Sequence, residues 1–192
     1  AKSFEKEGVT GKVVFGVVGD STFFHSGMTG AAEIVYNKGR MIPCVLDNRI
    51  TGMTGHQDNP GTGYTLQGDP TALLSVEKIL TALGFAPVLT VDPQDLKAMK
   101  AAVDQAVSAL DAGQQPAIVT RRPCLLIKRD KFRKGMCHVN ADKCRSCRSC
   151  LKVGCPAISL ENGKAVIDRT QCVGCTVCAQ VCPFDAIEKE EK

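Results

Sequence analysis

Two short cysteine-rich runs constrain this chain more than any other feature. The first run is CRSCRSCLKVGCP at residues 144–156, and the second is CVGCTVCAQVCP at residues 172–183. The first three cysteines of one run recur 28 residues later in the other, so the runs form an internal repeat. The eight thiols could belong to a disulfide framework, a zinc site or an iron–sulfur site.

The sequence outside the two runs argues against disulfides, and the cysteine spacing within them argues against zinc. The N-terminal residues AKSFEKEGVTGKVV contain no apolar targeting segment, and no stretch is apolar over the roughly 18 residues that a membrane span needs. We therefore expect a cytoplasmic protein with no membrane partner, and in a reducing compartment clustered cysteines are more often metal ligands or redox groups than disulfides. Structural zinc favours pairs of C-x2-C hooks separated by a loop, which three consecutive thiols at this spacing do not match.

The spacing C-x2-C-x2-C-x3-C-P is typical of bacterial ferredoxins, in which the fourth cysteine of each run binds the other of two [4Fe-4S] clusters. The predicted ligands are Cys144, Cys147, Cys150 and Cys182 for the first cluster, and Cys172, Cys175, Cys178 and Cys155 for the second. The first run has four residues, LKVG, before its last cysteine, and Gly154 is expected to accommodate the extra one. Cys137 lies outside the repeat and is expected to be a spare thiol.

The cysteine content changes along the chain, and this change marks a domain boundary. Only two of the eleven cysteines precede residue 137. A basic stretch lies just before that point, with seven basic residues against Asp130 and hence a net charge of +6; the basic residues are Arg121, Arg122, Lys128, Arg129, Lys131, Arg133 and Lys134. Without an aromatic platform or binding motif we expect no nucleic-acid partner, and we interpret the stretch as a solvated linker or a docking face for an acidic partner. The predicted divisions are a first domain at 1–120, a basic linker at 121–136 and a ferredoxin-like domain at 137–192.

The first domain alternates between two kinds of apolar pattern. Apolar, β-branched runs predict strands at 11–20, 41–48, 86–91 and 116–121, and helical periodicity predicts helices at 23–39, 75–84 and 95–110. Such alternation is typical of an α/β fold with a parallel sheet covered by helices. The predicted fold class is therefore an α/β parallel-sheet domain followed by a small α+β domain with two iron–sulfur clusters.

Oxygen-bearing side chains follow two of the predicted strands. Ligands of such sheets bind beyond the carboxyl ends of the strands, where Asp20 and Asn48 stand. If the two strands are neighbours, these oxygens converge in a way that suits Mg²⁺ and a diphosphate. Asp and Asn are also common turn formers and helix N-caps after strands, so both interpretations stay open on spacing alone.

A family resemblance adds to this pattern. The sequence GDS, 26 further residues and then Asn is similar to the thiamine-diphosphate motif, which usually reads GDG, about two dozen residues and Asn. GDSTFFHSG, LDNRITGMTGHQDNPGTG and the cysteine-rich tail together resemble the C-terminal portion of the large subunit of indolepyruvate ferredoxin oxidoreductases, over essentially the whole chain. The resemblance implies that Asp20, Asn48 and the backbone carbonyl of Ile50 bind Mg²⁺. It implies cofactor contacts from Gly19, Asp20, Ser21, Asn48, Ile50, Thr54, Gly55 and Gln57.

The resemblance also implies an activity: thiamine-diphosphate-dependent oxidation of a 2-oxoacid such as an arylpyruvate to acyl-CoA and CO2, with coenzyme A as acyl acceptor and electrons passing through two [4Fe-4S] clusters to ferredoxin. No residue can be given the role of the glutamate that activates the thiamine in that superfamily, so catalytic residues are unassigned. We expect a fragment of a longer polypeptide, or a subunit of an oligomer that completes its site with a partner chain. The alternative is an electron-transfer subunit docked on another enzyme, without thiamine chemistry of its own.

Overall fold

The computed structural model describes residues 6–8, 11–127 and 135–190. The chain divides into two units, Ala1–Arg129 and Asp130–Lys192, which are described separately below. The first unit extends beyond the predicted residue 120, because the backbone N–H groups of Arg122 and Cys124 donate to the carbonyls of Asp47 and Asn48 at 3.0 and 2.9 Å. The predicted linker therefore begins inside the first unit. Its residues 128–134 lie outside the described residues, and for them the linker stays a prediction.

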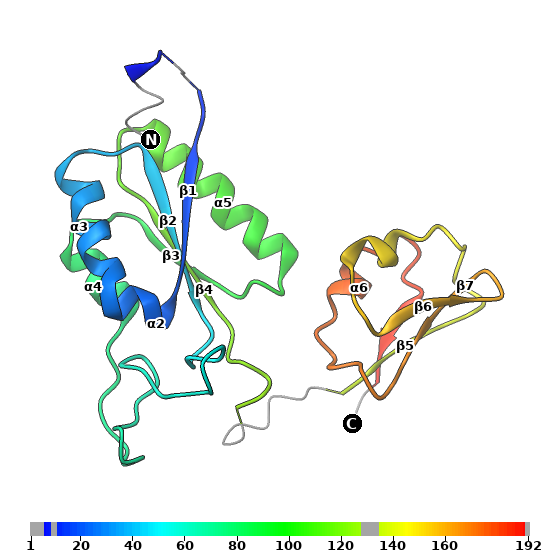
Figure 1. The fold of residues 1–192 in the computed structure, drawn as a ribbon. Coiled ribbons are helices and arrows are strands. Elements are labelled where there is room, and N and C mark those ends of the chain that lie inside the picture. The colour runs from blue at the N-terminus through cyan, green and yellow to red at the C-terminus, as the bar shows by residue number, and fades with distance from the viewer. Residues whose placement is uncertain (1–5, 9–10, 128–134, 191–192) are drawn as a thin grey trace. The chain divides into compact units, whose positions relative to one another are not determined.

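A parallel sheet forms the centre of the first unit (Figure 1). Its strands lie in the order β1-β2-β4-β3, and every neighbouring pair is parallel. Their bounds are β1 Val14–Gly19, β2 Met41–Asp47, β3 Val88–Val91 and β4 Ala117–Arg121. All four carboxyl ends therefore meet at one edge, and the predicted α/β class is confirmed.

Helices cover both faces of this sheet, with α5 on one face and α3 and α4 on the other (Figure 1). The helices are α2 Asp20–Thr22, a π-helical turn η1 Phe23–Gly27, α3 Met28–Tyr36, α4 Val76–Ala82 and α5 Leu96–Asp111. The first three form one helical run that starts directly after β1. This run begins at Asp20, three residues before the predicted start at residue 23. It also ends early, because Lys38 adopts a φ of 49° and the Gly39 N–H closes the last turn on the Ile34 carbonyl at 2.8 Å.

The apolar side chains form one core on each face of the sheet. On the side of α3 and α4, Phe23, Val45 and Leu80 are almost completely buried together. On the side of α5, Ile42 and Ile118 pack against Ala106, and Cys44 is a small core residue there. Because both faces are covered, β2 and β4 carry nearly continuous apolar sequence.

The second unit is built from two short antiparallel ribbons. Strand β5 (Cys137–Val139) pairs with β8 (Ile187–Lys189), and β6 (Ile158–Glu161) pairs with β7 (Lys164–Ile167). A 3-10 helix, η2 (Ser149–Val153), lies within the first cysteine run, and the short helix α6 (Val177–Gln180) lies within the second. Cysteines make up much of the small core that these elements enclose. In the described parts of both units, no helix is long and apolar enough to cross a membrane.

Candidate cofactor and cluster sites

The carboxyl ends of β1 and β2 bring the two predicted Mg²⁺ ligands to one place. The strands are direct neighbours, and Gly19 is in register with Leu46. Asp20 and Asn48 therefore follow adjacent strand ends at the same edge of the sheet. Gly19 leaves this edge open, since a Cβ atom there would meet nothing within 4 Å.

Asp20 is the most enclosed polar residue at this edge, with 3% of its surface exposed. One carboxylate oxygen accepts the Ser21 N–H at 2.7 Å, and the other accepts the side-chain amide of Asn59 at 3.3 Å. Burial raises the pKa of Asp20, and the nearby Asp47 carboxylate raises it further, against the lowering effect of the N–H donors around it. A bound Mg²⁺ would supply positive charge that favours the ionised form of this buried carboxylate.

Asn48 forms the tight turn that follows β2. Its side-chain oxygen accepts the Ile50 N–H at 3.0 Å, while its backbone carbonyl accepts the Cys124 N–H. The Asn48 side chain is exposed, whereas only 4% of Ile50 is exposed. Hydrogen bonds therefore hold the turn at both ends. It carries the amide oxygen of Asn48 and the backbone carbonyl of Ile50, which are ligand types that Mg²⁺ accepts.

An ion-pair network lies directly under this turn. Asp47, 4% exposed, accepts from the Arg121 guanidinium at 2.8 Å and from the Arg49 N–H at 3.2 Å. Arg121 also pairs with Glu77 at 2.5 Å. Arg122, next in the chain, pairs with Asp92 at 2.5 Å. These two arginines were predicted to belong to a solvated linker or a docking face for an acidic partner. The structure corrects that prediction for both, because each has a carboxylate partner within the first unit.

The predicted cofactor loop after this turn is exposed. The Thr54 hydroxyl donates to the Gln57 side chain at 2.8 Å, and the Gln57 amide donates back to the Thr54 carbonyl at 2.7 Å. Gly55 has a φ of 127°, and a Cβ atom there would stand 3.1 Å from the Gln57 amide nitrogen. The three residues form a closed exposed turn, and their contact with a cofactor stays a prediction.

Asn59 belongs to the Asp20 site although sequence analysis did not select it. It is 9% exposed, donates to Asp20, and accepts the Gly61 N–H at 2.9 Å. Gly61 must lack a side chain, since a Cβ atom would come within 2.8 Å of the Phe24 ring. The only sequence signal was the string DNPG, which predicts a turn but not a contact with a residue 39 positions earlier.

The four cysteines predicted for the first cluster line one cavity; this first cysteine set is Cys144, Cys147, Cys150 and Cys182. Burial raises the pKa of Cys150, and the charges of the other three thiolates raise it further. The Ala186 N–H donates to the Cys182 sulfur at 3.4 Å. The hydroxyl of Ser149 and its backbone lower the pKa of Cys147, and the positive charge of Lys152 adds to this effect.

The second cysteine set comprises Cys155, Cys172, Cys175 and Cys178. Burial raises the pKa of Cys178 to about 12, and the nearby Cys137, Cys175 and Cys155 contribute to the rise. Cys137, with 1% exposed, lies among these thiols, and its N–H donates to the Cys172 sulfur at 3.4 Å. Sequence analysis treated Cys137 only as a residue outside the repeat and did not predict this position.

The backbone repeats along with the cysteines. Ser146 and Arg148 have φ values of 58° and 63°, and the residues 28 positions later, Gly174 and Thr176, have φ values of 70° and 64°. These left-handed residues turn each loop around its thiols. Gly154 has a φ of 70° at the end of η2, directly before Cys155, which is the conformation expected of a glycine that accommodates an extra residue.

The first cysteine set, which lines a cavity, has the arrangement that a cluster would need. Among the described residues, no group of three or more His, Cys, Asp or Glu side chains converges tightly enough for one metal ion. A cubane separates its thiolates by the width of its inorganic core, so its ligands surround a cavity and do not meet at a point. The raised pKa values of Cys150 and Cys178 fit this, because buried thiolates need a positive core to stay ionised.

Comparison with protein families separates the two units. Residues 4–120 match the family described as "Thiamine pyrophosphate enzyme, C-terminal TPP binding domain". Residues 165–188, which include most of β7 and three of the four cysteines of the second set, match the "4Fe-4S binding domain".

Curated relatives combine both parts. The chain is 40% identical over 197 aligned residues to "Indolepyruvate oxidoreductase subunit IorA" of Pyrococcus abyssi, which covers 98% of this chain and 30% of the relative. It is 41% identical to the protein of the same name from Thermococcus kodakarensis, again over 98% of this chain and 30% of the relative. The "Putative electron transport protein YsaA" of Escherichia coli is 39% identical over 34% of this chain. The chain thus spans about 30% of the length of the two archaeal relatives.

Proposed function

Because this chain belongs to the thiamine pyrophosphate enzymes, through their C-terminal TPP binding domain, we propose that it is the C-terminal part of a 2-oxoacid:ferredoxin oxidoreductase. In this proposal the enzyme oxidises an arylpyruvate such as indolepyruvate to the acyl-CoA and CO2. The first unit binds the diphosphate of thiamine diphosphate through Mg²⁺. The second unit holds two [4Fe-4S] clusters that pass the electrons to ferredoxin.

One observation carries the proposal. The buried carboxylate of Asp20 and the Asn48–Ile50 turn stand at neighbouring strand ends of a unit that is covalently joined to a cysteine-rich unit. Carbon chemistry that releases electrons needs both a cofactor site and an electron path. An electron-transfer scaffold alone would not need a buried carboxylate with a raised pKa at the open edge of its sheet.

The residues of the first unit would act by positioning. Asp20, the Asn48 amide oxygen and the Ile50 carbonyl would hold Mg²⁺, and the Asn59 amide keeps the Asp20 carboxylate oriented. Asp47 is ion-paired with Arg121 and Arg49, so it is not a second free carboxylate beside Asp20, although its charge still raises the pKa of Asp20. When bound, thiamine diphosphate supplies the carbon nucleophile and electron sink for decarboxylation.

The residues of the second unit would hold and insulate the clusters. The first cysteine set lines its cavity together with apolar side chains such as Leu160 and Ile187, while Cys147 stays exposed. N–H donors to sulfur, from Ala186 to Cys182 and from Cys137 to Cys172, favour the electron-rich state. That the second unit holds two clusters, and that the first unit binds Mg²⁺, are parts of this proposal.

The similarity to a putative electron transport protein over about a third of the chain favours a second candidate, an electron-transfer module without thiamine chemistry. Titration of the anaerobically prepared chain with thiamine diphosphate and Mg²⁺ in a calorimeter separates the two. We expect saturable binding, a loss of affinity of at least about tenfold in Asp20→Asn, and about eight irons per chain in both proteins.

Asp69→Asn is the matched control for this experiment, because Asp69 is an exposed carboxylate in the loop that follows the site. It removes the same charge and should leave the affinity unchanged. If the wild-type chain and Asp20→Asn bound thiamine diphosphate and Mg²⁺ with equal affinity, the first unit would not contain the thiamine site. The electron-transfer module would then be the remaining candidate function.

A further inference from the structure

The two cysteine sets share a backbone pattern but differ in charge. Between its first three cysteines, the first run carries Arg145 and Arg148, and Lys152 follows. The equivalent residues of the second run, 28 positions later, are Val173, Thr176 and Gln180, none of which is charged. The two runs share their backbone turns but differ in charge, which indicates that the two clusters have different functions.

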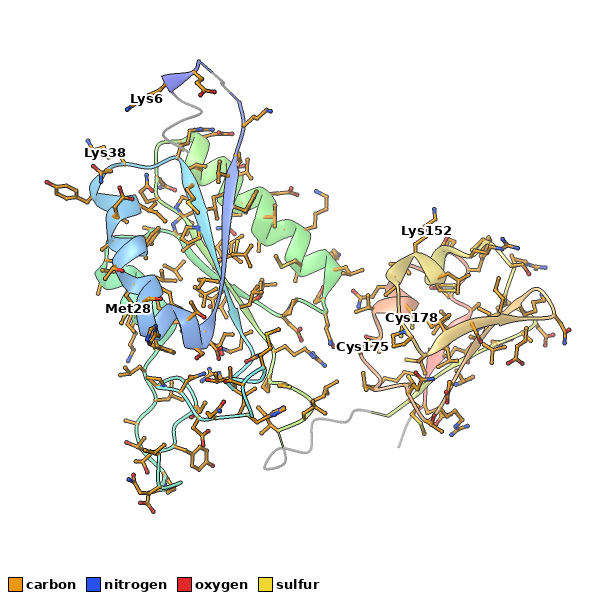
Figure 2. The ribbon with its side chains drawn as sticks, in the orientation of Figure 1. Lys6, Met28, Lys38, Lys152, Cys175 and Cys178 are labelled. Atoms are coloured by element: carbon orange, nitrogen blue, oxygen red, sulfur yellow. The ribbon has the colours of Figure 1, made fainter. Side chains whose placement is uncertain are left out.

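The basic residues of the first run are free to meet a partner. Arg145, Arg148 and Lys152 are exposed, and in the described part of the chain none of them forms an ion pair. Lys143 and Arg169 of the same unit, in contrast, pair with Glu188 and Glu190. Figure 2 shows Lys152 projecting outward from the unit, whereas Cys178 lies on α6. Among the described residues of the second unit, three basic side chains without an ion pair thus gather around the first set, while Lys164 donates to the Cys144 carbonyl and Lys189 lies on β8.

One thiol of the first set is more accessible than any thiol of the second. Cys147 is exposed, while no cysteine of the second set is. Phe184 lines the same cavity as Cys147 and is 43% exposed. An aromatic side chain together with arginines is the composition enriched in protein–protein interfaces. We define Arg145, Cys147, Arg148, Lys152 and Phe184 as the Cys147 face.

We propose that the Cys147 face is the docking surface for an acidic one-electron redox protein, and that the first cluster is the exit point for electrons that reach it from the second. This inference rests on the proposed function, since it requires both clusters. Positive charge and solvent exposure stabilise the reduced, more negative state of a cluster, so the first cluster has the higher reduction potential. The electrostatic attraction that orients the partner thus also sets the direction of transfer.

The transfer itself changes no covalent bond. A reduced cluster held by Cys144, Cys147, Cys150 and Cys182 would supply one electron and become oxidised, and the oxidised iron–sulfur centre of the acceptor would gain that electron. The contribution of Arg145, Arg148 and Lys152 is to raise the encounter rate with an acidic surface. That contribution must weaken as salt screens the charges.

The test is a stopped-flow measurement on the full chain after anaerobic reconstitution, with iron content and electron paramagnetic resonance spectra recorded first. The photoreduced chain is mixed with an oxidised plant-type [2Fe–2S] ferredoxin as the acidic probe. The variant is Arg145→Gln/Arg148→Gln/Lys152→Gln. The control is Lys12→Gln/Lys78→Gln/Lys97→Gln, which removes the same charge from exposed positions of the first unit.

We expect the second-order rate constant of the Cys147-face variant to fall about tenfold at low salt, and the difference from wild type to vanish near 1 M salt. The control should stay within about twofold of wild type. In a redox titration, one of the two cluster potentials should become more negative in the variant and the other should stay constant.

Several results would overturn the inference. Equal slowing in variant and control would show an effect of net charge alone, and unchanged kinetics would remove the docking surface. Unchanged kinetics with lost binding to a DNA duplex would reassign the face to nucleic acid. If neither cluster reduction potential changed in the variant, the first cluster would not be the exit point for electrons. If the chain binds thiamine diphosphate and its clusters normally in any of these cases, only the docking inference fails and the proposed function stands. A chain without clusters would overturn both the docking inference and the proposed function.

Discussion

The two units of this protein assemble their candidate sites in opposite ways. In the second unit, all eight predicted cluster ligands come from two runs of about a dozen residues, and local left-handed turns place them. In the first unit, Asp20, Asn48 and Asn59 come from two strand ends and a long loop, and only the parallel sheet brings them together. A short-range site can therefore be recognised by spacing, whereas a long-range site needs the fold.

The largest expected effect tests the local character of the second unit. Cys150→Ser should lower the iron content from about eight to about four per chain, because Cys150 lines the cavity of the first cysteine set. Cys137→Ser is the matched control: it removes a thiol that is equally buried but surplus to the ligand count, and about eight irons should remain. Iron analysis and electron paramagnetic resonance spectroscopy measure both outcomes. Loss of a cluster in Cys137→Ser would mean that spacing alone did not identify the ligands.

An intermediate effect tests the long-range character of the first unit. Asn59→Ala removes the amide that orients Asp20 from 39 positions away. We expect the affinity for thiamine diphosphate and Mg²⁺, measured by calorimetry, to fall about tenfold. Asn37→Ala, which removes an exposed amide bonded to Glu33, is the control and should have no effect. An unchanged affinity in Asn59→Ala would confine the site to the two strand ends.

The smallest effect concerns the network below the site. Burial acts to raise the pKa of Glu77, but the hydrogen bonds from Arg121 and Ser75 outweigh it and hold the pKa at about 2. Glu77→Gln should destabilise the first unit by about 2 kcal/mol at neutral pH. Because the folded pKa is depressed from 4.5, this stabilisation is present above about pH 4.5 and is lost as the pH falls towards 2.

Urea unfolding followed by tyrosine fluorescence measures this effect, since both tyrosines, Tyr36 and Tyr64, lie in the first unit. Glu33→Gln, at an exposed helical position, should change stability by less than about 0.5 kcal/mol. A difference between wild type and Glu77→Gln that does not shrink with acidification would show that the carboxylate charge is not what stabilises the network.

Much of the fold was accessible from sequence because its signals are local. The parallel sheet, the order of helices and strands, and the cysteine-rich second unit all follow from periodicity and spacing. The errors fell at element ends, where the helical run begins at Asp20 and includes a π-helical turn. They also fell at Arg121 and Arg122, because charge counting cannot tell that a basic residue has a carboxylate partner across the sheet.

The sequence by itself determined the two-unit plan, the repeated cysteine spacing and the strand-end positions of Asp20 and Asn48, because these depend on residues close together in the chain. Only the tertiary structure decided that Asn59 reaches Asp20, that Arg121 neutralises Asp47, and that Cys137 lies among the thiols of the second set. Such contacts join residues tens of positions apart, and their formation depends on how strands pair and loops return, which no local pattern encodes.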